Sequence, residues 1–189
     1  MNNNPTKINL SFIALFIVAV VYFVNVFDHA KWNTSEPENR QLIAYDAVEY
    51  YAYLPALFVH KDLTFRFIEK PLPKGYTGRF WVAKLPNGKY TGRMTLALSA
   101  MMMPAFLVAH AAAHLFGYTP DGYTQPYQLA LAIWGVLAAL CGLYFCQKTL
   151  MLFFNQWLAA LVVLALGIGT NLYHYASNEN AMTHNYNFF

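Results

Sequence analysis

Hydrophobic residues in this chain are gathered into four long blocks instead of following the regular rhythm of an amphipathic helix. The first block covers residues 8–27 and is interrupted only by Asn9, Ser11 and Asn25. A helix of about 20 residues, at roughly 1.5 Å rise per residue, spans the hydrocarbon layer of a bilayer. Because a segment in lipid must satisfy all of its backbone polar groups internally, we predict a transmembrane helix here despite the many β-branched residues.

A cleaved signal peptide is the alternative for this first block. Its apolar run is longer than the roughly 7–15 residues typical of a signal peptide, and no small-x-small cleavage site follows Phe27. An uncleaved anchor over residues 1–27 is therefore the favoured interpretation.

The third and fourth blocks, residues 128–146 and 157–173, are nearly continuous apolar runs. The fourth is slightly short, but the aromatic residues that follow can extend it into the membrane interface. We predict transmembrane helices over residues 127–150 and 157–176. With the anchor, they indicate an all-α, multi-pass membrane fold.

The second block, residues 95–116, has spanning length but carries Pro104 near its middle. Proline removes one helix hydrogen bond and clashes with the preceding turn, although membrane helices tolerate it. The block is therefore either one spanning helix or a pair hinged near Pro104. We expect the hinged pair, interfacial or re-entrant, within residues 94–126. His110 and His114 have the i, i+4 spacing of a metal pair, but no third ligand is evident, which favours packing.

The composition supports a membrane protein and argues against a nucleic-acid-binding protein. The chain is 58% hydrophobic and only 11% charged, whereas soluble domains have a charged share of roughly 25%. The net charge of +3 includes no basic tract, which argues against nucleic acid as a partner. Cys141 and Cys146 lie inside an apolar block and are interpreted as small buried hydrophobic residues.

Charges in the short connecting segments predict the topology. Residues 147–156 contain Lys148 and no acid, whereas residues 117–126 contain Asp121 and no base. The positive-inside rule then places the former in the cytoplasm and the latter outside. We expect the protein to lie in the inner membrane of the cell, with residues 28–93 as an extracytoplasmic loop.

The long loop contains the first candidate chemistry. Asp46, Glu49, Tyr50 and Tyr53 follow one another at i, i+3, i+4 and i+7, which places them on one face of a helix. One interpretation is a pair of carboxylates and phenols that act together. The other is the solvated face of an interfacial helix whose tyrosines belong to the aromatic belt.

A second polar cluster closes the chain, over residues 177–189. It contains Glu179, His184 and several amides at the end of a predicted membrane helix. Such groups are costly when buried unpaired in lipid, so they either line a cavity or form an ordinary surface loop.

The order of these features resembles the N-terminal module of the GT-C superfamily of membrane glycosyltransferases, which includes protein mannosyltransferases and aminoarabinose transferases. The resemblance rests on short motifs spread along most of the chain: Asp46 with Tyr50-Tyr51 and Tyr53-Leu-Pro55, Lys89-Tyr90-Thr-Gly92-Arg93, Phe116-Gly117, Gly169-Thr-Asn171-Leu-Tyr173, Glu179, and Met182-Thr-His184.

The resemblance implies transfer of a sugar from a polyprenyl-phosphate carrier, with inversion, to an acceptor on the extracytoplasmic side. Asp46 resembles the loop acid of this family, which acts as general base or holds a divalent cation. The residues implied in substrate binding are Glu49, Tyr50, Tyr53, Arg93, Glu179 and His184. Family members continue through many more membrane helices, so we expect this chain to be a truncated N-terminal portion.

The rival class is a non-enzymatic membrane protein, such as a transporter fragment or an assembly subunit. Transporters often show internal repeats and polar residues at mid-membrane depth. The sequence has no repeat, and its polar clusters lie at helix ends. Whether Asp46 and the Glu179 and His184 cluster face one cleft distinguishes the two classes. A third interpretation is a membrane-anchored peptidase that uses His110 and His114. It is disfavoured because no catalytic glutamate accompanies the two histidines.

Overall fold

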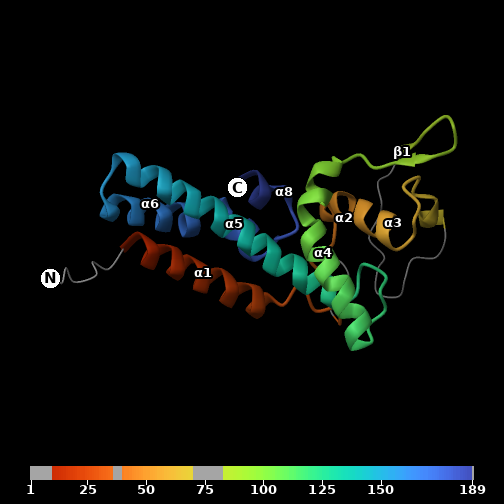
Figure 1. Cartoon of the computed structure of the whole chain (residues 1–189), viewed down its shortest axis with the longest axis horizontal. Helices are drawn as coiled ribbons and strands as arrows, with labels where there is room; N and C mark the ends of the chain where they lie inside the picture. Colours follow the sequence, from red (N-terminus) through yellow and green to blue (C-terminus); the bar gives the residue numbers. More distant parts are fainter. Residues whose placement is uncertain (1–9, 36–39, 70–82, 189) are drawn as a thin grey trace, which may run out of the picture.

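The computed structural model describes residues 10–35, 40–69 and 83–188, and these confirm the all-α class (Figure 1). The helices are α1 (Leu10–His29), α2 (Asp46–Tyr51), α3 (Tyr53–Phe58), α4 (Leu96–Phe116), α5 (Gln125–Phe153), α6 (Gln156–Gly169), α7 (Asn171–Ser177) and α8 (Thr183–Phe188), with one 3-10 turn, η2 (Arg66–Glu69). Strands β1 (Ala83–Lys84) and β2 (Tyr90–Thr91) form a small antiparallel hairpin, whose turn is closed by a 2.9 Å hydrogen bond from the Gly88 amide to the Leu85 carbonyl.

Helices α1, α5 and α6 form an elongated bundle and lie side by side along the long axis of the molecule (Figure 1). Gln147, near the end of α5, donates a 2.6 Å hydrogen bond to Ser11, near the start of α1. At the opposite end, Asn25 donates to Ser177 at 2.7 Å. Helix α5 therefore runs antiparallel to α1. We call the end of the bundle near Asn25 and Ser177 the loop end.

Close backbone approach holds α1 against α6. A Cβ atom on Gly167 would come within 2.8 Å of Val18, so only glycine allows this separation. The buried Tyr22 hydroxyl uses the same gap and donates a 2.7 Å hydrogen bond to the Gly167 carbonyl. Small residues at such contacts are typical of membrane helix packing, where lipid offers no hydrophobic driving force between helices.

The fourth apolar block is not the single helix expected over residues 157–176. Helix α6 ends at Gly169, and α7 turns away from it by 64°. Thr170 lies at the break, where its hydroxyl accepts from the Leu172 amide at 3.2 Å and donates to the Leu166 carbonyl at 2.6 Å. A side chain thus supplies partners for backbone groups that the break leaves unpaired.

The hinged pair expected near Pro104 is wrong, because α4 is one continuous helix of 21 residues. Pro104 cannot donate to the preceding turn. A neighbouring carbonyl, that of Met101, accepts a 2.8 Å hydrogen bond from the Trp134 indole of α5. Packing against α5 therefore supports the turn that contains the proline.

Helix α4 lies steeply across the loop end of the bundle (Figure 1). Ser99 near its start donates to the Tyr50 carbonyl of α2. The chain after α4 returns to the same region, where the Gly122 carbonyl accepts a 2.5 Å hydrogen bond from Tyr51. Both connections of α4 therefore meet the loop that follows α1.

By length and composition, three of the described helices are able to cross a membrane: α1, α4 and α5. The bent pair of α6 and α7 adds a fourth span if it is counted as one. The membrane character of the chain is thus supported by helices as well as by composition.

Both connections of α4 contact the loop that follows α1, so we predict that both ends of α4 lie on the same side of the membrane. In a variant with Cys141 and Cys146 replaced, single cysteines are introduced at Arg40, Tyr118 and Leu152. An impermeant maleimide applied to intact cells is expected to label positions 40 and 118 but not position 152. Labelling of position 40 without position 118 would show that α4 crosses the membrane and would overturn this arrangement.

A second prediction concerns the close contact of α5 with the chain after α7. A Cβ atom on Gly135 would overlap the backbone of Asn180, whereas one on Gly169 meets nothing within 4 Å. Gly135→Ala is expected to lower the thermal unfolding temperature in detergent, because overpacking costs roughly 1–3 kcal/mol. Gly169→Ala is the matched control and should leave it unchanged or raise it. Equal effects would contradict the packing.

Candidate functional site

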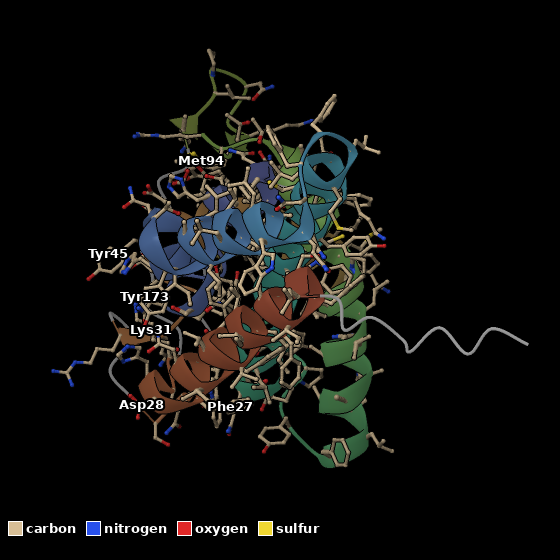
Figure 2. The ribbon with its side chains drawn as sticks, turned by 90° about the vertical axis from the view of Figure 1, so that its left-hand side faces the viewer. Phe27, Asp28, Lys31, Tyr45, Met94 and Tyr173 are labelled. Carbon is tan, nitrogen blue, oxygen red and sulfur yellow. The ribbon has the colours of Figure 1, made fainter. Side chains whose placement is uncertain are left out.

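A small cavity of about 30 Å³ lies at the loop end of the bundle. It joins three segments that are far apart in the sequence: the turn after α1, the loop before α2, and the turn after α7. Figure 2 shows Lys31 and Tyr45, from the first two segments, on the same flank of the molecule as Tyr173 of α7. The residues that line the cavity are Lys31, Gln41, Leu42, Ala44, Tyr45, Ala47, Asn178, Glu179 and Met182.

An ion pair crosses this cavity. The Lys31 ammonium lies 3.6 Å from a carboxylate oxygen of Glu179, and the two side chains are 34% and 33% exposed. Sequence reasoning singled out Glu179 but missed Lys31. The available signal was its position, because Lys31 is the first lysine or arginine after the apolar anchor.

A buried amide fixes the loop on the bundle. The Oε1 atom of Gln128, near the start of α5, accepts a 2.9 Å hydrogen bond from the Ile43 amide. Its Nε2 atom donates to Gln41 at 3.0 Å. The Leu42 amide between them donates to the Lys31 carbonyl at 2.9 Å. These bonds hold the loop before α2 against both α1 and α5.

Strained backbone precedes two of the charged residues in or beside the cavity, Lys31 and Asp46. Ala30 has φ 46° and is followed by Lys31, and Tyr45 has φ 51° and is followed by Asp46. A side chain in the left-handed region costs about 1–3 kcal/mol, and residues held in this way cluster at functional sites. Tyr45 is also 62% exposed, so its ring is free to contact a ligand.

Asp46 begins α2 between two residues that line the cavity, Tyr45 and Ala47, and it is half-buried. Glu49 is different, because it is only 1% exposed and neither carboxylate oxygen has a hydrogen-bond partner in the described structure. The interpretation of a single solvated face is therefore wrong for Glu49. Burial, and secondarily the charge of Glu49, raise the pKa of Tyr53 above its usual value.

The other loop residues lie away from the cavity lining. The Tyr53 hydroxyl donates to the Met94 carbonyl at 3.2 Å and also touches Gly92, where a Cβ atom would come within 2.7 Å of it. Arg93 is exposed and Tyr50 is half-buried. The structure thus joins Tyr53 to the segment around Arg93, but neither residue lines the cavity that Glu179 lines.

His184 is exposed on α8 and stacks on Tyr175, with ring centroids 3.7 Å apart. It does not line the cavity either. The turn that carries Glu179 is stabilised by amides, since Asn180 donates to the Ala176 carbonyl and Asn185 donates to the Tyr175 carbonyl at 2.9 Å. The polar motif at the end of the chain is thus partly structural.

No group of three potential metal ligands is found among the described residues. The Nδ1 atom of His110 lies 2.5 Å from the Tyr127 hydroxyl, and its ring meets His114 edge-on at 4.9 Å between centroids. This arrangement agrees with a packing role for the two histidines. The expected divalent cation beside Asp46 stays a prediction.

No protein-family model, curated protein or solved structure matches this chain.

The strain at Tyr45 makes a prediction that separates backbone from ring. Tyr45→Gly and Tyr45→Ala both remove the phenol, but only glycine adopts φ 51° without cost. Tyr45→Gly is expected to be more stable than Tyr45→Ala by about 1 kcal/mol. Thermal unfolding of the two variants, side by side, measures the difference. An alanine variant as stable as the glycine variant would show that position 45 is unstrained.

Proposed function

We propose that this chain forms part of a membrane glycosyltransferase that moves a sugar from a polyprenyl-phosphate carrier to an acceptor hydroxyl on the extracytoplasmic side. One observation carries the proposal. The start of α2, which bears Asp46, and the turn that bears Glu179 meet at one cavity, although more than half of the chain separates them.

The position of the cavity suits a lipid-linked donor. It lies where α1 ends, and a 20-residue helix such as α1 is about as long as the hydrocarbon layer is thick. A carrier whose tail is in the bilayer presents its phosphate and sugar at this depth. The apolar helices anchor the site there, and the loop end places polar residues beside the headgroups.

Asp46 has the chemistry required for the transfer. Its carboxylate takes the proton of the acceptor hydroxyl as that oxygen attacks the anomeric carbon. The bond between this carbon and the phosphate oxygen breaks, and the carrier phosphate leaves with the electron pair. Attack opposite to the leaving group inverts the anomeric carbon. Glu49 is enclosed and is poorly placed for the same role.

The tyrosines divide into two groups in this proposal. Tyr51 is fully buried and its hydroxyl is engaged with Gly122, so it holds the fold and does not contact a sugar. Tyr45 lines the cavity and is exposed, so it is the ring most suited to stack on a sugar.

A transporter or assembly subunit remains the second class, but the roles of the polar side chains within the bundle favour the enzyme. Tyr22, Asn25 and Gln147 all form hydrogen bonds between helices. They therefore serve packing, and the polar residues grouped around a cavity are at the loop end.

The functional prediction concerns Asp46 in the protein encoded by the complete reading frame. Asp46→Asn keeps the size of the side chain but removes its basicity, so transfer should fall by about 10²–10⁴-fold. The assay follows sugar transfer from a polyprenyl-phosphate donor in membranes, with protein level measured in parallel. Asp28→Asn removes an exposed acid at the end of α1 and is the matched control, expected to retain activity.

Glu49→Gln completes the comparison and should cost far less than Asp46→Asn. If Asp46→Asn stayed near the wild-type rate while Glu49→Gln abolished transfer, Glu49 would be the base. If neither substitution changed the rate, the glycosyltransferase proposal would lose its principal residue.

A further inference from the structure

Lys31 lines the cavity, but it has no role in the proposed transfer reaction. We propose that Lys31 binds the phosphate of the lipid carrier. Without the carrier, the Glu179 carboxylate pairs with the Lys31 ammonium, and the phosphate displaces this carboxylate when it binds. This inference rests on the proposed function and names the group that recognises its donor.

The first support is the position of Lys31. It follows the last residue of α1 by two positions, which puts its ammonium at headgroup depth. The left-handed conformation of Ala30 turns the chain there, and the Asn33 amide closes the turn with a 2.8 Å hydrogen bond to the Ala30 carbonyl. Leu42 then fixes the Lys31 carbonyl. The backbone of Lys31 is therefore held in place while its side chain reaches the cavity.

The second support is the weakness of the ion pair. A separation of 3.6 Å exceeds the roughly 2.7–2.9 Å of a strong charge-assisted hydrogen bond. Both side chains are about one-third exposed, and ion pairs in such positions contribute little to stability. A phosphate, with several anionic oxygens, competes effectively for an ammonium that is held so loosely.

The third support is the size of the cavity. A volume of about 30 Å³ holds only one or two water molecules. A phosphate therefore enters only when the Glu179 side chain moves aside. Once displaced, Glu179 repels the phosphate and Lys31 attracts it, so the two residues oppose each other in ligand binding. Asn178 also lines the cavity and carries a side-chain amide, a group able to donate to a phosphate oxygen.

Because the two residues oppose each other, removing the charge of Glu179 should strengthen phosphate binding. A purely structural ion pair would instead predict that the same substitution weakens it. The full chain is placed in phosphatidylcholine nanodiscs, and binding of tritiated farnesyl phosphate is measured with empty nanodiscs subtracted. Lys31→Gln is expected to weaken binding about tenfold, because a charge-assisted contact is lost. Glu179→Gln should tighten it by roughly two- to fivefold, because the competing charge is removed. The double variant should bind like Lys31→Gln.

Lys148→Gln is the matched control. Lys148 lies at the opposite end of the bundle, 5.3 Å from the Phe12 ring centroid, so its loss should leave binding unchanged. Equal weakening by Lys31→Gln and Glu179→Gln would show a structural ion pair and would overturn the inference. The same holds if farnesol binds as well as farnesyl phosphate, or if phosphatidylglycerol or inorganic phosphate competes equally.

The outcomes also separate this inference from the proposed function. If sugar transfer requires Asp46 but Lys31→Gln binds farnesyl phosphate like the wild type, only the assignment of Lys31 fails. If binding depends on Lys31 with the expected signs while no sugar transfer is detected, the phosphate site stands and the glycosyltransferase proposal fails.

Discussion

The arrangement of the loop end depends on the buried side chain of Gln128. Its amide satisfies a backbone donor of the loop through Oε1 and bonds the Gln41 side chain and the Tyr123 carbonyl through Nε2. A buried polar group without a partner costs roughly 1–3 kcal/mol, so a loop that moved away would leave several groups unpaired at once. One amide therefore keeps the loop before α2 at a fixed height on α5, and the cavity exists because that loop is held there.

The apolar pattern was sufficient to predict the main helices. Residues 8–27 became α1 with a shift of two residues at each end, and the third block became α5, which is longer by three residues at its start and by seven at its end. Periodicity is a weak guide in lipid, but length is reliable, because a membrane segment has to form a helix. The same reasoning failed at Pro104, since a tertiary contact from Trp134 supports the turn and no local pattern indicates such a partner.

The candidate site was predictable in its residue types but not in its arrangement. Helical spacing placed Glu49 with Asp46, yet packing of α2 against α4 encloses Glu49 and leaves Asp46 partly accessible. The role of Lys31 was not predictable from the sequence, because its partner, Glu179, lies far away along the chain. Contacts of this range depend on how helices pack, and a single sequence records them only indirectly.

The break between α6 and α7 sets the depth at which the two halves of the site meet. Helix α7 has 7 residues and is about 10 Å long. If α7 continued α6 without a bend, this whole length would extend along the axis of α6. With a bend of 64°, its advance along the axis falls to about 5 Å. The turn that carries Glu179 is thus about 5 Å lower than a straight helix would place it. The break at Thr170 therefore sets the height of the Glu179 carboxylate relative to the Lys31 ammonium, because a straightened helix would carry the carboxylate past the ammonium.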